Sequence, residues 1–399
     1  MKPLLGFAAI CLAYMPFSFC EEGNEITESR IAHIETALQE HSKLFENLTA
    51  YSQYDNGQSR TQMGQQNMSQ QNMSGQDVMD HSAHGCLDSG FTIQAEFLYW
   101  RANMDMLEYV LQSNGDNILV SSKAEFHEPD FEYDPGVRVG IGYDFGRSNW
   151  DVLLAWTYHY TSVSDSRGSD ARPLSQVATR FQTASGTTFN FIASTTAKAD
   201  WQMRLNALDL EFGYDYFFSK QFSMRPHFGL KAAWLDMHYN VAYRGAIDSV
   251  AGNNISLGSM RTHSDYWAVG PRMGFDSYLH IGWGFSLYGK VAGALIYGEY
   301  DAETKFTLDR DPTPPFNTTG VNNYPLKHND YSRLRAVLEM SIGLEWGYCF
   351  SNEYYLGFNI GWENQYWWNQ LETYFLTTDF HPRGDLTYSG LNAGVRFDF

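Results

Sequence analysis

Apolar and polar side chains alternate with a period of two residues over most of the chain between residues 91 and 399. In 333–348, every second residue from Leu334 to Tyr348 is apolar, while the opposite face carries charges such as Glu339. Successive side chains of a strand point to opposite faces, whereas a helix follows a period of 3.6. Alternation over segments of about ten residues is what a β-strand needs to cross a lipid bilayer.

Ten segments follow this rule, and the links between them alternate in length. The predicted strands are 91–101, 137–145, 150–160, 205–217, 224–239, 265–280, 284–298, 333–348, 354–368 and 387–399. Short links alternate with long ones, which run near 102–136, 161–203, 240–264, 299–332 and 369–386. Short periplasmic turns and longer external loops are typical of outer-membrane barrels. The sequence therefore predicts an all-β, antiparallel up-and-down transmembrane barrel of about ten strands, or of twelve or more if 176–195 contains another hairpin.

Composition narrows the class of protein. The 399 residues include 46 acidic and 27 basic side chains, for a formal net charge of −19, and 16% are aromatic. The acid excess argues against nucleic-acid binding, which needs clustered Lys and Arg. After residue 20 there is no apolar run of about 18 residues, as a membrane-spanning helix would require. A large secreted β-protein and an outer-membrane barrel remain.

Aromatic side chains favour the barrel. One set lies close to the short links, and a second set lies near the long ones: Trp100, Tyr158, Tyr160, Trp201, Tyr239, Tyr266, Trp267, Tyr297 and Trp367. Tyr and Trp favour the boundary between membrane and water, since one end of each side chain is apolar and the other polar. Two such girdles predict a wall that crosses a bilayer.

The part of the chain before the predicted barrel divides into three segments. Residues 1–20 combine one positive charge, an apolar stretch and small residues near the end, which predicts a cleaved secretory signal peptide. Lipidation at Cys20 is the alternative. In 21–50, apolar residues at heptad spacing predict a periplasmic amphipathic or coiled-coil helix. Residues 51–90 are rich in Gln, Asn, Ser, Gly and Met and predict a flexible, disordered linker before the barrel of 91–399.

The end of the linker holds a cluster of soft metal ligands, Met79, His81, His84 and Cys86. Thioether, imidazole and thiol groups together suit Cu(I), so copper handling is one hypothesis; a polar linker without bound metal is the alternative. The predicted topology places Cys86 and Cys349 on the periplasmic side. In that oxidising compartment they could form a disulfide or remain free thiols.

Inward-facing positions of the predicted strands carry many charges. The lumen-facing candidates are Glu96, Arg138, Asp144, Asp151, Asp209, Glu211, Asp215, Arg225, His227, Lys231, Arg272, Asp276, Lys290, Arg335, Glu339, Glu345, Glu363 and Arg396. Acids outnumber bases modestly, which would favour cations in an open channel. A barrel of about ten strands is narrow, however, so these charges could instead pair and close the lumen.

Histidine and aspartate also occur as sequence neighbours at the predicted loops. They are His238, His263, His328 and His381, with Asp236, Asp265, Asp330 and Asp379 nearby. Catalysis needs a defined geometry that sequence proximity does not supply, and no serine-hydrolase, metalloprotease or phosphate-loop motif is present. We expect no enzymatic activity and no cofactor.

Three stretches resemble one family, the major outer membrane proteins of legionellae and chlamydia-like bacteria. They are GFTIQAEFLYWRANMDMLEYV (90–110), PGVRVGIGYDF (135–145) and GLNAGVRFDF (390–399), and FLYW at 97–100 is the most specific part. The likeness spans most of 88–399. It implies an abundant surface barrel, with porin activity and host-cell attachment proposed for relatives. The chain departs from the chlamydial pattern in having few cysteines, so extensive disulfide cross-linking is not expected.

These features predict a porin for small solutes that is also a structural surface protein of a Gram-negative outer membrane. The alternative is an adhesin whose loops 161–203 and 299–332 bind a host surface ligand, and copper handling is a third hypothesis. Expected partners are outer-membrane lipid and lipopolysaccharide, the barrel-assembly machinery and a second copy of the chain in a homo-oligomer. The assembly machinery would bind the C-terminal strand that ends at Phe399.

Overall fold

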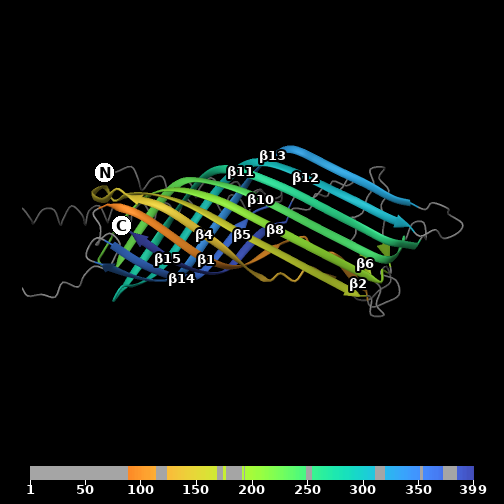
Figure 1. Cartoon of the computed structure of the whole chain (residues 1–399), viewed down its shortest axis with the longest axis horizontal. Coiled ribbons are helices and arrows are strands. Elements are labelled where there is room, and N and C mark those ends of the chain that lie inside the picture. The colour runs from red at the N-terminus through yellow and green to blue at the C-terminus, as the bar shows by residue number, and fades with distance from the viewer. Residues whose placement is uncertain are drawn as a thin grey trace, which may run out of the picture. The chain divides into compact units, whose positions relative to one another are not determined.

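A computed structural model describes residues 89–113, 124–168, 174–176, 191–192, 194–248, 254–310, 320–350, 354–371 and 384–399. Within these residues ten antiparallel strands form a closed barrel wall (Figure 1). The wall strands are β1 (Gly90–Met104), β4 (Tyr133–Asp144), β5 (Trp150–Gly168), β8 (Thr196–Tyr214), β10 (Phe222–Asp248), β11 (Asn254–Gly282), β12 (Phe285–Arg310), β13 (Gly320–Phe350), β14 (Tyr354–Trp367) and β15 (Leu386–Asp398). The predicted up-and-down barrel of ten strands is confirmed.

Short elements accompany the wall. β2 (Val110–Ser113), β3 (Ala124–His127) and β6 (Leu174–Gln176) form a small separate sheet, and β7 (Phe191–Ile192) and β9 (Tyr216–Phe217) each pair with β10. A 3-10 turn, η3 (Gly146–Ser148), links β4 to β5. Since β6 and β7 pair with different partners, the described residues contain no extra wall hairpin within 176–195. Nor do they contain a helix long and apolar enough to span a membrane.

The predicted signal peptide (1–20) and helix (21–50) lie outside the described residues, as does all of the predicted linker except Ser89 and Gly90.

The barrel closes between its first and last strands. β1 pairs with β15 over thirteen residues, from Thr92 opposite Asp398 to Met104 opposite Leu386. Beyond that ladder, the backbone amide of Phe399 donates to the carbonyl of Phe91 at 2.9 Å, and Phe91 donates back at 2.8 Å. The terminal residue therefore completes the seam. It lies at the end of the barrel that carries the short turns, which is the periplasmic end in outer-membrane barrels.

The turn between β11 and β12 consists of two residues with positive φ, Trp283 (56°) and Gly284 (81°). Two left-handed residues make a type I′ turn, whose twist matches that of the flanking strands. A Cβ atom at Gly284 would lie 2.4 Å from the carbonyl oxygen of Gly347, so glycine is required there. The Trp283 side chain is 93% exposed at the tip, as suits an aromatic anchor at a membrane surface.

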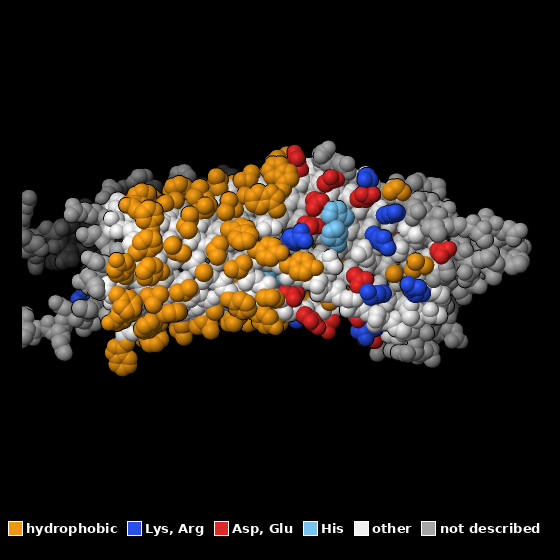
Figure 2. Space-filling view, in the orientation of Figure 1, with side chains coloured by type: hydrophobic (Ala, Val, Ile, Leu, Met, Phe, Trp, Pro, Cys, Tyr) orange, Lys and Arg blue, Asp and Glu red, His pale blue; other side chains and the backbone are white. Residues whose placement is uncertain are grey.

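Part of the way along the long strands, the apolar residues change from the outward face to the inward face. In β12, Leu295 and Tyr297 point outward and are exposed, and the next outward residues are Glu299 and Asp301. The inward positions change in the opposite sense, from charged and small residues near the turn to buried apolar ones such as Phe306. The outer wall therefore has an apolar belt next to the short turns and a charged region beyond it (Figure 2).

This inversion corrects the predicted loops. The ranges 240–264 and 299–332 are mostly strand, because β10 to β13 continue far past the belt. Likewise β5 and β8 extend into 161–203. A strand in water still alternates, but its apolar side faces the barrel interior rather than lipid.

The second aromatic girdle was also only partly right. Tyr160, Trp267 and Tyr297 are exposed on the outer wall, as predicted. Five other members are buried inside the barrel: Trp100, Trp201, Tyr239, Tyr266 and Trp367.

Candidate functional site

The lumen contains two zones, and the zone farther from the short turns is apolar. Trp100, Trp201 and Trp367 project inward from β1, β8 and β14 and are fully buried. Phe131 packs edge-on against Trp201, with ring centroids 5.2 Å apart. On the same side, Tyr388 lies 5.7 Å from the Trp100 ring. These side chains belong to one buried apolar cluster inside the barrel.

The segment that follows β1 enters this zone. Leu107, Tyr109 and Val110 are fully buried against the wall. The Tyr239 hydroxyl of β10 donates to the carbonyl of Leu107 at 2.6 Å, and the Tyr243 hydroxyl donates to the carbonyl of Tyr109. Two wall tyrosines thus hold the backbone of 105–113 in the barrel mouth.

Stacked tyrosines connect the apolar zone to the charged one. Tyr300 lies between Tyr266 and Tyr331, with ring centroids 4.0 Å and 5.4 Å away. The Arg335 guanidinium donates to the Tyr300 hydroxyl at 3.3 Å and lies over its ring. Arg335 is one of the predicted lumen-facing residues, and its charge lies over the face of the Tyr300 ring.

The centre of the charged zone is a five-residue ion cluster. The Lys231 ammonium lies 2.9 Å from Asp209 and 2.6 Å from Glu339. Arg272 contacts the same Glu339 at 2.8 Å and also bonds to Glu211. These residues come from β8, β10, β11 and β13, so the cluster ties strands on different sides of the barrel together.

A second cluster surrounds Arg138 of β4. Its guanidinium contacts Glu96 at 2.8 Å and Glu363 at 2.7 Å. Its Nε donates to the Thr157 hydroxyl at 3.0 Å, and Gln365 donates to Glu363 at 2.8 Å. Each of the three guanidinium nitrogens of Arg138 therefore donates a hydrogen bond, as a buried guanidinium requires.

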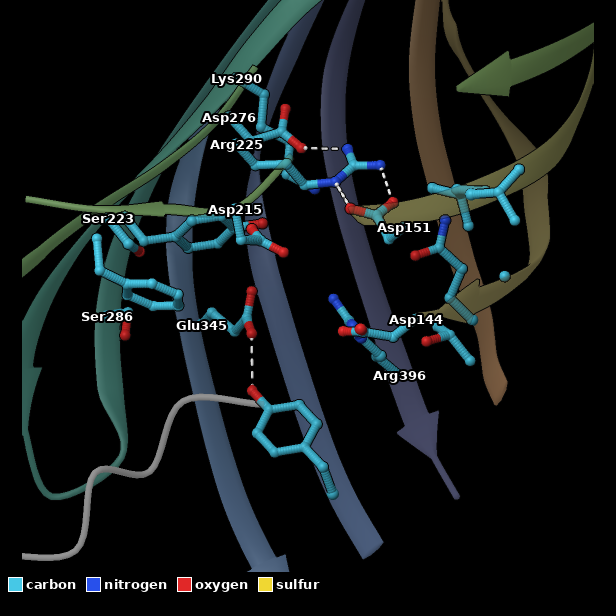
Figure 3. Close-up of a pocket in the computed structure, with 18 of the residues that line it drawn as sticks. Asp144, Asp151, Asp215, Ser223, Arg225, Asp276, Ser286, Lys290, Glu345 and Arg396 are labelled. Atoms are coloured by element: carbon cyan, nitrogen blue, oxygen red, sulfur yellow. Dashed lines mark hydrogen bonds and ion pairs between the residues drawn. The ribbon is translucent and has the colours of Figure 1, made fainter. Parts of the chain in front are cut away.

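A third cluster lies toward the short turns and borders a cavity. Arg225 contacts Asp151, lies 2.9 Å from Glu211 and lies 3.2 Å from Asp276 (Figure 3). His227, from the same strand, is buried 3.8 Å from both Glu211 and Asp276. Since Glu211 also binds Arg272, this cluster continues into the central one.

Two cavities lie inside the charged zone. The one nearer the short turns has a volume of about 120 Å³ and is bordered by Asp144, Asp215, Glu345 and Arg396 among others. The second, about 100 Å³, lies among the central and Arg138 clusters. Both are lined by Asp276 and Lys290, so they meet at these residues.

The remaining predicted lumen residues have local partners. Arg396 pairs with Asp398 at 2.9 Å, and Glu345 accepts from the Tyr355 hydroxyl at 2.9 Å. Asp144 accepts from the backbone amide of Gly146 at 2.7 Å, in the turn after β4. The Lys290 ammonium lies 5.3 Å from the centre of the Tyr288 ring. The charges therefore lie on the inner face, paired mainly with one another.

Sequence reasoning missed the apolar half of the lumen. The signal was present in pairs such as Asp301 and Ala302, or Lys305 and Phe306, where the outward residue is charged and the inward one apolar. The apolar inward face was missed because every charged stretch was assigned to a loop.

Most of the residues predicted to bind metal or to form a disulfide lie outside the residues that the structure describes. Met79, His81, His84 and Cys86 lie outside the described residues. Cys349 is disulfide-bonded, and its predicted partner is Cys86.

The structure places two histidines of the predicted loops on strands. His263 lies on β11 and His328 on β13, whereas His238, at the end of the predicted strand 224–239, lies on β10 as expected. His381 lies outside the described residues. Strand extension past the belt is again the reason for the difference.

Only a lipid bilayer provides a matching environment for a continuous belt of exposed apolar side chains, and a closed barrel leaves no unpaired strand edge within it. The fold therefore defines the class: an outer-membrane β-barrel protein. The family described as Legionella pneumophila major outer membrane protein precursor matches residues 83–399, and the chain belongs to this family.

Comparison with solved structures gives loose likenesses to outer-membrane barrels. The outer membrane protease OmpT of Escherichia coli is 12% identical, with a TM-score of 0.36, and the match covers 78% of this chain and 97% of that one. A major outer membrane protein of Thermus thermophilus is 11% identical, with a TM-score of 0.26 and coverages of 78% and 99%. OprG of Pseudomonas aeruginosa is 10% identical, with a TM-score of 0.25 and coverages of 77% and 95%. No curated protein matches the chain.

Proposed function

We propose that the chain is a structural surface protein of the outer membrane whose lumen is closed and whose projecting wall provides an attachment surface. The observation that supports this best is the packing of the apolar lumen zone. Trp100, Trp201 and Trp367 and the segment 105–113 meet there, and the three Trp side chains are fully buried. Passage of solutes needs space between side chains, and ten strands enclose little.

The projecting wall supports the attachment role. β13 runs from Gly320 to Phe350, about three times the length needed to cross a bilayer. Beyond the belt the wall carries charges of both signs (Figure 2). The adhesin hypothesis placed binding in the loops 161–203 and 299–332. Strands occupy much of both ranges, so in this proposal the wall itself carries part of the binding surface for a host ligand.

A porin is the second candidate, and the two cavities favour it. They share the lining residues Asp276 and Lys290, and charged side chains line both. Conduction would require the segment 105–113 and the apolar layer to move. The acid excess in the lumen would then favour cations.

Planar-bilayer conductance separates the two candidates. The full-length chain, refolded and checked by heat-modifiable gel mobility, should show no stable conductance steps, while a general porin inserted in the same way should show them. Stable steps from the full-length chain would overturn the closed-lumen proposal in favour of the porin. Steps only from a chain lacking residues 21–90 would make that region the gate of a porin.

Attachment is tested separately on cells that display the chain. Arg261 and Lys305 are cross-strand partners on the outer wall beyond the belt. Reversing both charges, Arg261→Glu with Lys305→Glu, should reduce binding to host cells. Lys220→Glu, in the exposed turn at the opposite end, is the matched control and should leave binding unchanged. Equal binding by all three proteins would count against attachment through this wall.

A further inference from the structure

Two histidines face each other on the outer wall of the barrel, just beyond the apolar belt. Trp234 and Trp267 form the last apolar cross-strand pair of β10 and β11, and His238 pairs with His263 further along the same strands. The two imidazole rings stack with centroids 4.3 Å apart. Their side chains are 46% and 40% exposed, so solvent reaches both. Figure 2 shows histidines on this wall among acidic side chains.

Each ring has a carboxylate beside its Nε2 atom. Nε2 of His263 lies 2.8 Å from Oδ2 of Asp265, and Nε2 of His238 lies 3.2 Å from Oδ1 of Asp236. The Asp265 carboxylate favours the His263 tautomer that carries its proton on Nε2, which leaves a lone pair on Nδ1 of that ring. The two Nδ1 atoms are 3.2 Å apart. Without a metal, an Nδ1–H of one ring can donate to Nδ1 of the other; a cation that replaces this proton would be bound by both nitrogens.

The separation of the two Nδ1 atoms fits a shared metal ion. With zinc–nitrogen bonds of about 2.0–2.1 Å, nitrogens 3.2 Å apart subtend an angle of about 99–106° at the ion, close to tetrahedral. Oδ1 of Asp236 is 3.7 Å from Nδ1 of His263, and these three residues offer ligand atoms within 4.8 Å of one another. A third ligand is therefore within reach.

The surrounding charges also favour a cation. Asp236 lies opposite Asp265, and Asp265 lies opposite Asp301, so three carboxylates follow one another across β10, β11 and β12. Like charges directly opposite each other destabilise a sheet. Arg204 lies 3.4 Å from Asp236 and offsets part of this charge, while Glu303, opposite His263, pairs with Lys327. A divalent ion would offset much of the remainder.

We propose that Asp236, His238 and His263 bind a divalent transition-metal ion on the outer wall, with Zn²⁺ as the best match. Two imidazoles and one carboxylate suit Zn²⁺, Ni²⁺ or Cu²⁺, whereas Ca²⁺ and Mg²⁺ prefer oxygen ligands alone. Asp265 is a positioning residue that orients the His263 ring. The exposed side chains leave the remaining coordination position to water. This site is independent of the lumen and of the proposed attachment role.

Zinc titration of the full-length refolded chain, in competition with a chelating dye, tests the proposal. The wild-type chain should bind one equivalent that both His238→Gln and His263→Gln lose. Asp265→Asn should bind it about 10–100-fold more weakly, as expected when a carboxylate that orients a metal-bound histidine is lost. The matched control is the double variant His81→Gln/His84→Gln, which removes the N-terminal histidine cluster and should keep this equivalent.

A second measurement uses the wild-type chain alone and so does not depend on the folding of variants. Zn²⁺ should protect His238 and His263 from modification by diethyl pyrocarbonate, detected by mass spectrometry, while His127 reacts unchanged. Unaltered zinc stoichiometry in both His238→Gln and His263→Gln would overturn the proposal. So would equal modification of His238 and His263 with and without zinc.

Discussion

Replacing Lys231 with Met should destabilise the barrel strongly. Its ammonium is buried and lies 2.9 Å from Asp209 and 2.6 Å from Glu339. Removing one partner of a buried ion pair costs about 3–5 kcal/mol, because the other charge is left without compensation. Arg272 still contacts Glu339 at 2.8 Å but reaches Asp209 only at 3.5 Å. Asp209 therefore accounts for most of the loss, and the expected value is near the lower limit, about 3 kcal/mol.

Urea unfolding of the chain in lipid vesicles, followed by tryptophan fluorescence, measures this loss. Lys198→Met is the matched control, because Lys198 lies 2.7 Å from Asp200 but both side chains are well exposed. Such a pair contributes about 0–1 kcal/mol. The double variant Lys231→Met/Asp209→Asn should recover part of the stability by removing the stranded carboxylate. Equal effects of Lys231→Met and Lys198→Met would refute the reasoning.

Three further predictions follow from other parts of the chain. Burial, and then repulsion from Asp385, raises the pKa of Asp105 in the barrel mouth above its usual value. Its ionisation therefore lowers native stability as the pH rises through that raised pKa. Asp105→Asn should increase the thermal midpoint of unfolding at pH 7 and leave it unchanged at pH 3. Equal shifts of the midpoint at both pH values would contradict this. Tyr243→Phe, which strands the buried carbonyl of Tyr109, should lower the unfolding free energy by about 1–3 kcal/mol, and Tyr297→Phe on the exposed outer wall should have little effect in the same urea titration. Non-reducing peptide mapping should find Cys349 linked to Cys86 and no such link in Cys349→Ser, whereas a link to Cys11 or Cys20 would exclude that pairing.

The sequence was sufficient for the part of the fold that lies in lipid. Between Val137 and Ile141, or between Met340 and Leu344, the outward residues are apolar and their neighbours are small or charged, which only a strand with lipid on one side explains. Because successive side chains of a strand point to opposite faces, charges such as Arg138 and Glu339 could then be assigned to the interior without any knowledge of contacts. Their partners could not be predicted, because Arg138 and Glu363 are 225 residues apart in sequence and meet only across the closed barrel.

The region beyond the belt was harder to predict for a physical reason. There the outer face is in water and the inner face forms a packed core, so the sequence resembles that of an ordinary soluble sheet. Trp201 and Tyr239 suit a membrane boundary and a protein core equally well, and the sequence alone does not distinguish these environments. The pairing of His238 with His263 depends on the register of β10 with β11, which the assignment of 240–264 to a loop concealed.

The inverted alternation also fixes how deep the protein sits in the membrane. In β12 the wall changes from Tyr297 to Glu299 within one step of the strand, and the neighbouring strands change at a similar level. At a strand tilt of about 40°, sinking by two residues, about 5 Å, would push carboxylates such as Glu299 into hydrocarbon, and rising by the same distance would expose apolar side chains to water. From Gly298 to Arg310 the strand rises about 3.4 Å per residue and, at a tilt of about 40°, lifts its far end roughly 30 Å above the belt. The wall therefore has a fixed height above the lipid surface, so a ligand bound at its rim would be held at a constant distance from the membrane.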